Sequence, residues 1–172
     1  TLIKVMPYET EQLLTISVQI NAKNVMHSQN IDGLISQELK NNFEGYCGKY
    51  GYVIKNSIQM IQRSIGKTVI VDGESKIQYS VTYKMKTIYP CKDDIYECTV
   101  SSTTKMGIVG YLDYNTGSED SITLKTSPLL IIIPNEDINR EIVAGDKVQV
   151  VVRAVKIKYR SPQIQIIAKI SD

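Results

Sequence analysis

The 172-residue sequence contains no tryptophan, one phenylalanine, one histidine and three cysteines. Because Cys47, Cys91 and Cys98 are odd in number and show no Cys-x-x-Cys spacing, a disulfide framework is not expected. His27, the single histidine, leaves too few ligands for an ordinary zinc site. We therefore expect reduced cysteines in an intracellular protein that carries no metal and no other cofactor.

Further absences narrow the functional class. The sequence has no apolar run near 18 residues and no visible signal peptide, so no membrane partner is expected. The glycines of residues 45–51 lack the spacing and the following helix of a phosphate-binding loop. A nucleophile–histidine pair could use only His27, and the acidic group Asp93, Asp94 and Glu97 is interpreted as surface charge. The sequence therefore indicates a protein that is not an enzyme.

The composition is that of an ordinary globular protein. Hydrophobic residues make up 42% and charged residues 22%, and this length fits one large or two small domains. A formal charge of +2 is too small to indicate nucleic-acid binding by itself, so only the distribution of basic residues can do so. The 11 tyrosines suit strands that have one face in water.

The first part of the chain predicts one strand and one helix. Residues 14–20 alternate apolar and polar side chains, as a half-buried strand does, and the mostly polar segment 21–30 follows. Asn30 suits a helix N-cap, and Gly45 suits a helix end. Between them the apolar residues form one stripe of the single helix expected here: Ile31, Leu34, Ile35 and Leu39.

Residues 44–54, with glycines at every third position among tyrosines, predict a bent strand, because glycine in a strand marks a bulge or a bend. Short strands are expected at 57–63 and 67–71, and the turn Asp72-Gly73 leads to a long strand over 77–86. The buried face of that strand should carry Ile77, Tyr79, Val81, Tyr83 and Met85.

Pro90 ends this region, and we place a domain boundary there. Residues 1–89 are expected to form an α+β domain, a small antiparallel sheet wrapped on one helix. Residues 90–172 predict an all-β domain. Its five strands are expected at 95–102, 107–113, 129–133, 147–160 and 163–170. Since closure removes exposed strand edges, a five-stranded oligonucleotide-binding (OB) barrel is the expected solution.

Basic residues gather in the last part of the chain, because residues 147–169 contain no acidic residue. A one-residue bulge near Ala154 and Val155 would put four basic side chains on one exposed face, those of Arg153, Lys156, Lys158 and Arg160. Tyr159 would then point to the other face. Such a strip can follow a single-stranded RNA backbone, or it can simply be a solvated face. The candidate RNA-binding residues are Lys105, Tyr111, Arg153, Lys156, Lys158, Tyr159 and Arg160.

Two stretches resemble a known family. Residues 44–54 are similar to its Glu-Gly-x-x-Gly-x-x-Gly-hydrophobic strand. Tyr79-x-Val81-x-Tyr83 followed by Tyr89-Pro90 is similar to its last N-terminal strand and the start of its barrel. On these motifs the chain resembles the stalk subunit of multisubunit DNA-directed RNA polymerases, which is the seventh subunit of eukaryotic RNA polymerase II and its archaeal counterpart. A tip at 21–29 without prolines points to a divergent, viral or distant eukaryotic member.

This resemblance implies a non-catalytic transcription subunit in a hetero-oligomer. The N-terminal domain would dock on the clamp region of the polymerase core and meet a second stalk subunit, if one exists. The barrel would contact nascent single-stranded RNA. The protein would then work in the nucleus, or in the virion and host cytoplasm if it is viral. The implied docking residues are Asn21, Lys23, Asn24, Val25, Met26, His27 and Ile31.

Two other functions use the same residues. A free-standing OB-type RNA-binding protein in translation or RNA turnover would use the basic strip, but it would leave residues 1–89 without a clear role. A purely structural module would use the barrel to contact protein alone. Association with a polymerase would distinguish a stalk subunit from both of these other functions.

Overall fold

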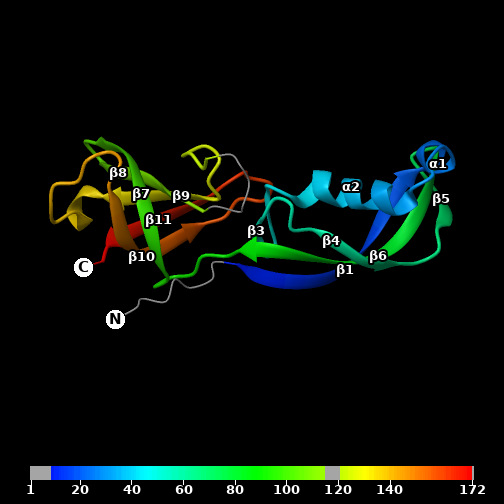
Figure 1. The fold of residues 1–172 in the computed structure, drawn as a ribbon, viewed down its shortest axis with the longest axis horizontal. Coiled ribbons are helices and arrows are strands. Elements are labelled where there is room, and N and C mark those ends of the chain that lie inside the picture. The colour runs from blue at the N-terminus through cyan, green and yellow to red at the C-terminus, as the bar shows by residue number, and fades with distance from the viewer. Residues whose placement is uncertain (1–8, 115–120, 172) are drawn as a thin grey trace. The chain divides into compact units, whose positions relative to one another are not determined.

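The computed structural model describes residues 9–114 and 121–171. The chain divides into two compact units (Figure 1). The first unit comprises Thr1–Glu44 and Val53–Thr87, and the second comprises Gly45–Tyr52 and Ile88–Asp172. The glycine-tyrosine segment therefore groups with the C-terminal half of the chain, although it precedes most of the N-terminal strands in sequence.

In the first unit, strand β6 (Glu74–Ile88) pairs on both sides. On one side it runs antiparallel to β1 (Thr10–Asn21), in an unbroken register. On the other side it pairs antiparallel with β4 (Gln59–Arg63) and with β5 (Lys67–Val71). A register shift between Met60 and Gln62 marks a bulge in β4.

The alternation predicted for β6 is confirmed, because one of its faces is buried. Helix α2 (Ile31–Phe43) contributes Ile35 and Leu39, both fully buried, to the core of this unit. The ring of Phe43 stacks on Tyr83 with centroids 6.0 Å apart, which places the end of α2 against the buried face of β6. The other buried residues of that face are Tyr79, Val81 and Met85.

The two ends of the segment between β1 and α2 are fixed by asparagine caps. Asn30 Oδ1 accepts from the Gly33 N–H at 2.9 Å, as the sequence predicted for the start of α2. Asn21 Oδ1 accepts from the Lys23 N–H at 2.9 Å and caps a second helix, α1 (Ala22–Met26). The expected single-helix domain was therefore wrong, because a helix of one turn is too short to produce an apolar periodicity. Neither α-helix in the described residues has the length and apolar character needed to cross a membrane.

The second unit contains a closed five-stranded barrel. Its strands are β7 (Ile95–Thr104), β8 (Gly107–Leu112), β9 (Leu129–Pro134), β10 (Lys147–Lys156) and β11 (Ile164–Ile170). Their order around the barrel is β10-β11-β9-β8-β7. The β9–β11 pair is parallel and the others are antiparallel. This mixed barrel is compatible with the OB type expected from the sequence.

Alternate residues of every barrel strand point inward. Gly110 is required by close packing, because a Cβ there would collide with Cys98 Sγ. Gly107 adopts φ +148°, and a Cβ there would collide with the Ile133 carbonyl oxygen. The fully buried residues of this core include Cys98, Leu129, Ile131, Ile133, Val150, Val152, Ile164, Ile166 and Ala168.

Two strand predictions were wrong in detail. The predicted strand 44–54 is a short hairpin of β2 (Cys47–Gly48) and β3 (Gly51–Val53), because the left-handed φ of +100° at Gly51 turns the chain. The predicted strand 147–160 ends at Lys156, and its register shift lies between Val152 and Ala154. The basic residues beyond Lys156 therefore lie in the connection to β11 rather than on a strand face.

Candidate docking tip and nucleic-acid interface

The tip of the first unit is helix α1, which contains no buried residue. Met26 is 81% exposed, and Val25 is half-buried. Among the other predicted docking residues, Lys23, Asn24 and His27 are exposed, whereas Asn21 and Ile31 are half-buried. The structure thus collects the predicted set on one short helix and its two flanks, and leaves the Met26 side chain in solvent.

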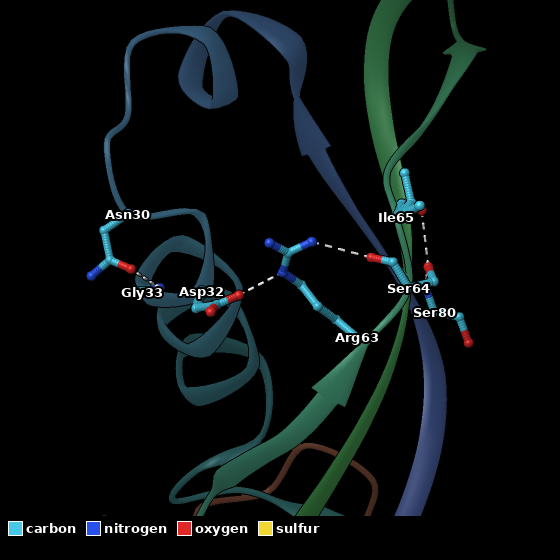
Figure 2. A network of polar contacts seen from close by, with 7 residues as sticks. All are labelled: Asn30, Asp32, Gly33, Arg63, Ser64, Ile65 and Ser80. Atoms are coloured by element: carbon cyan, nitrogen blue, oxygen red, sulfur yellow. Dashed lines mark hydrogen bonds and ion pairs between the residues drawn. The ribbon is translucent and has the colours of Figure 1, made fainter.

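A polar network holds the start of α2 beside the sheet (Figure 2). Arg63 at the end of β4 donates from Nε to Asp32 Oδ1 at 2.5 Å and from Nη1 to the Ser64 carbonyl at 3.2 Å. Ser64 Oγ donates to the Ile65 carbonyl and accepts from the Ser80 N–H of β6 at 2.9 Å. One arginine thus joins the first turn of the helix to the connection between β4 and β5.

The same arginine also lies over a tyrosine ring of the sheet. The Arg63 guanidinium carbon lies 5.4 Å from the centre of the Tyr79 ring. The side chains of Arg63 and Asp32 are 30% and 61% exposed, so their ion pair adds little to the stability of the fold. Asp32 also lies in the first turn of α2, where the helix dipole favours a negative charge. The network therefore mainly fixes the position of the start of α2.

Further apolar side chains of the first unit are exposed on the segment after β4. Ile65 is 91% exposed and Ile70 of β5 is 78% exposed. Sequence reasoning missed both, because Ile65 falls between two expected strands and an isoleucine within a strand-like pattern, such as Ile70, is ordinarily assigned to the core. The signal available was the alternation in β5, whose flanking Val69 and Val71 are half-buried. Ile65 and Ile70 thus add two exposed apolar positions of the first unit to the predicted Met26.

On the barrel, one register row joins four strands. Tyr111 pairs with Leu130, Leu130 with Gln165, and Gln165 with Lys156. Directly paired residues of neighbouring strands point to the same face, and the residues that flank Tyr111, Leu130 and Gln165 in sequence are buried. The row therefore lies on the outside of the barrel. It connects two of the predicted RNA-binding residues, Tyr111 and Lys156, which lie on strands that do not pair.

Lys105 does not join this row. It is exposed in the turn between β7 and β8, where its carbonyl accepts from Asn135 Nδ2. Because β7 and β10 are antiparallel, the C-terminal ends of the two strands lie at opposite ends of the barrel. Lys105 is therefore separated from the connection that follows Lys156.

Arg153 is also set apart from the other basic residues. Its Nη1 donates to both carboxylate oxygens of Asp137 at 2.8 and 2.9 Å. Asp137 belongs to the short 3-10 helix η1 (Asn135–Asp137), and its side chain is 13% exposed. This carboxylate offsets much of the Arg153 charge, so Arg153 presents less positive potential than an exposed lysine does. No sequence signal pointed to this partner.

The connection between β10 and β11 carries the remaining candidates. Lys158, Tyr159 and Arg160 are all exposed, and Tyr159 is 72% exposed. The Ser161 N–H donates to the Lys158 carbonyl at 3.0 Å and closes a turn, in which Arg160 has a left-handed φ of 63°. This basic turn (residues 158–161) is further held because Ser161 Oγ donates to the Gln163 carbonyl at 2.8 Å.

Strand β2 runs beside the basic turn. The Cys47 N–H donates to the Ser161 carbonyl, and the Arg160 N–H donates to the Cys47 carbonyl, both at 2.8 Å. The Arg160 guanidinium carbon lies 5.1 Å from the centre of the Tyr46 ring. Sequence reasoning treated residues 44–54 as purely structural and missed Tyr46. The available signal was that Tyr46 lies among three glycines. Its partner Arg160 is too distant in the sequence to be found from a local pattern.

The buried thiols show no sign of reactivity. Burial raises the pKa of the Cys47 thiol to about 11 and that of Cys98 to about 12, the latter partly offset by a backbone hydrogen bond from Tyr111. Both thiols therefore stay protonated at neutral pH and behave as packing residues. In the described ranges 9–114 and 121–171, no group of three or more His, Cys, Asp or Glu could hold a metal ion.

No protein-family model and no curated protein matches the chain.

Proposed function

We propose that this protein is a non-catalytic stalk subunit of a multisubunit DNA-directed RNA polymerase. The observation that carries the proposal is helix α1, which has no buried residue and exposes Met26 to 81% between β1 and α2. A docking contact at α1 would bury Met26 together with its half-buried neighbour Val25. The motif resemblance of residues 44–54 and 79–90 points to the same family.

The second unit supplies the proposed RNA contact. A five-stranded barrel with the order β10-β11-β9-β8-β7 and a parallel β9–β11 pair is the arrangement we assign to an OB fold, whose strand faces and connecting loops bind oligonucleotides. The basic turn and the outer row from Tyr111 to Lys156 would contact the emerging transcript. The protein would work in the nucleus, or in a virion and the host cytoplasm, beside a second stalk subunit where one exists.

Co-purification tests the docking proposal. The tagged full chain should recover polymerase core subunits from its source cells, and Val25→Glu with Met26→Glu should abolish that recovery because two charges would enter an apolar contact. The matched control is Met106→Glu on the barrel, where the methionine is 86% exposed. If both variants recover polymerase equally, α1 is not the docking element. If the native chain recovers none, the proposal fails.

One alternative keeps its own support. The basic turn is built entirely within the second unit, so RNA binding does not require the docking tip. A free-standing RNA-binding protein of OB type would bind RNA as strongly with the two α1 substitutions as without them, and would recover no polymerase. That pair of results would replace the stalk proposal with this alternative.

A further inference from the structure

We propose that β1 is a dimerisation strand, along which β1 of a second copy of this chain adds antiparallel and extends the sheet of the first unit. The inference goes beyond the proposed function, because it concerns a sheet edge that neither helix α1 nor the barrel forms. β1 lies at the end of its sheet (Figure 1). Among residues 9–114 and 121–171 it pairs with β6 alone.

The first support is that β1 lacks the features that protect sheet edges. Proteins prevent edge-to-edge pairing with short strands, bulges, prolines or lysines at the edge. β1 has 12 residues, and its pairing with β6 continues without a register shift from Thr10 to Asn21. It contains no proline and no basic residue, and Glu11 is its single charged residue. An edge of this kind is a template for another strand.

The second support is the contrast with the strands on the other side of β6. β4 and β5 have five residues each, and β4 bulges between Met60 and Gln62. Each of the two strands carries a basic residue, Arg63 in β4 and Lys67 in β5. The chain therefore places protective features on one side of this sheet and none of them on the other.

The third support is that the core of the first unit is incompletely covered along β1. On the core-facing side of this strand Val18 is buried, whereas Leu14 and Ile16 are half-buried. Their partners on β6, Tyr83 and Val81, are 2% and 0% exposed. The apolar rows of the sheet thus become accessible to water at β1. A strand added beside β1 would cover Leu14 and Ile16, and the burial of apolar surface would favour its binding.

The sequence of β1 is complementary to itself, which identifies a second copy as the partner. In an antiparallel pair with a two-fold axis at Thr15, residues equally distant from Thr15 lie opposite each other. Leu14 then lies opposite Ile16 of the second copy on the core-facing side. On the solvent side Glu11 lies opposite Gln19. Because the single charge of β1 is far from the axis, no like charges meet.

The solvent side of the pair also matches itself. Thr15 Oγ1 lies 2.9 Å from Thr82 Oγ1 of β6, and Gln19 Nε2 donates to Gln78 Oε1 at 3.1 Å. Polar pairs of this kind across strands stabilise a sheet. The two-fold axis puts the two Thr15 residues opposite each other, so the row of threonine hydroxyls would continue from one copy into the other.

The test is the mass of the full chain in solution, measured by sedimentation equilibrium at concentrations of about 1 to 200 μM. One pair of strands buries less area than a permanent dimer interface, so we expect a dissociation constant of about 1 to 50 μM. The mass should rise from that of one chain toward that of two over this range. A native chain that stays monomeric throughout overturns the inference, and leaves the β1 edge to a strand of another protein.

Thr15→Lys should weaken the association by about tenfold or more, because the two-fold axis would put two lysines opposite each other. The matched control is Ser80→Lys on β6. Ser80 pairs with Ser17 of β1 and is exposed on the same side of the sheet, but it lies one strand away from the edge. This control should associate as the native chain does. Circular dichroism checks that both variants are folded. Equal association of Thr15→Lys and the native chain overturns the inference.

Disulfide crosslinking tests the register of the pair. Cys91→Ser removes the exposed cysteine, and Cys47 and Cys98 are buried. In this background Thr15→Cys should link two copies when diamide is added as oxidant, because opposite residues have Cβ atoms about 5 Å apart. Leu13→Cys, at a position that is 68% exposed, is the control. Its two copies would lie about 14 Å apart along the strands and should not link. Stronger linkage through Leu13→Cys than through Thr15→Cys contradicts the proposed pairing.

These results are separable from the docking test. If the α1 variant loses polymerase while the native chain stays monomeric, the inference fails and the stalk proposal stands. If the native chain recovers no polymerase while Thr15→Lys abolishes its self-association, the stalk proposal fails and the dimerisation strand stands.

Discussion

Asp137 holds Arg153 through two contacts to a single guanidinium nitrogen, at 2.8 and 2.9 Å. The carboxylate is mostly buried, with its side chain 13% exposed, whereas the arginine side chain is 49% exposed. Arg153, which the sequence suggests as an RNA-binding residue, is therefore already paired with Asp137 of η1. Among the candidate RNA-binding residues, Lys156 and Lys158 remain exposed.

Asp137→Asn should release that charge. Removing the carboxylate leaves Arg153 free to meet phosphate, so the salt slope of RNA binding is expected to steepen by up to about 0.7. The lost ion pair should lower the free energy of unfolding by about 1 kcal/mol, measured by urea denaturation. A variant with unchanged slope would show that Arg153 lies off the RNA path. Arg153→Ala in the native background should change the slope by much less than Lys158→Ala does.

Val81→Asp should unfold the first unit. Val81 is fully buried in the middle of β6, and an uncompensated buried charge costs about 3–5 kcal/mol. Ser80→Asp is the matched control, because Ser80 is exposed on the opposite face of the same strand. Thermal unfolding followed by circular dichroism should show a lost transition for Val81→Asp alone. A folded Val81→Asp protein would contradict the assignment of the buried face.

Gly107→Ala should destabilise the barrel. The φ of +148° is unfavourable for alanine, and the new methyl group would collide with the Ile133 carbonyl oxygen of β9. We expect a loss of about 2 kcal/mol or more in the free energy of unfolding. Gly48→Ala should change stability little, because a Cβ there meets nothing within 4 Å. Equal denaturation midpoints for the two variants would show that β8 and β9 are spaced differently.

Alkaline pH should weaken the fold through the buried thiols. The pKa of Cys47 is raised to about 11 and that of Cys98 to about 12, from an ordinary value of 9.0. Above pH 9 the unfolded chain therefore loses these protons while the folded chain keeps them, so stability is present below pH 9 and falls as pH rises toward 11. Each thiol contributes a slope of about 1.4 kcal/mol per pH unit.

Denaturation midpoints measured between pH 7 and pH 10.5 would show this fall. Cys98→Ala should remove about half of the pH-dependent slope, whereas Cys91→Ser, at an exposed cysteine, should leave it unchanged. If Cys98→Ala and Cys91→Ser show the same pH dependence as the native chain, the alkaline loss belongs to other groups.

Elements whose signals are local could be predicted from the sequence. The alternation from Ile77 to Met85 predicted the buried face of β6, because a strand's side chains repeat every two residues. The stripe from Ile31 to Leu39, after its Asn30 cap, predicted α2. Five short apolar runs predicted a closed barrel, since closure is the way so few strands avoid exposed edges. Helix α1 escaped because a single turn has no period to read.

The tertiary structure decided which distant residues meet. Asp137 beside Arg153, Cys47 beside Arg160, and the row from Tyr111 to Lys156 all depend on strand register and on loops returning to a common place. The local sequence around each of these residues does not indicate which distant residue it will contact. Hydrophobic periodicity specifies which face of each strand is buried. It does not specify the hydrogen bonds between Cys47 and the basic turn, which place that turn beside Tyr46.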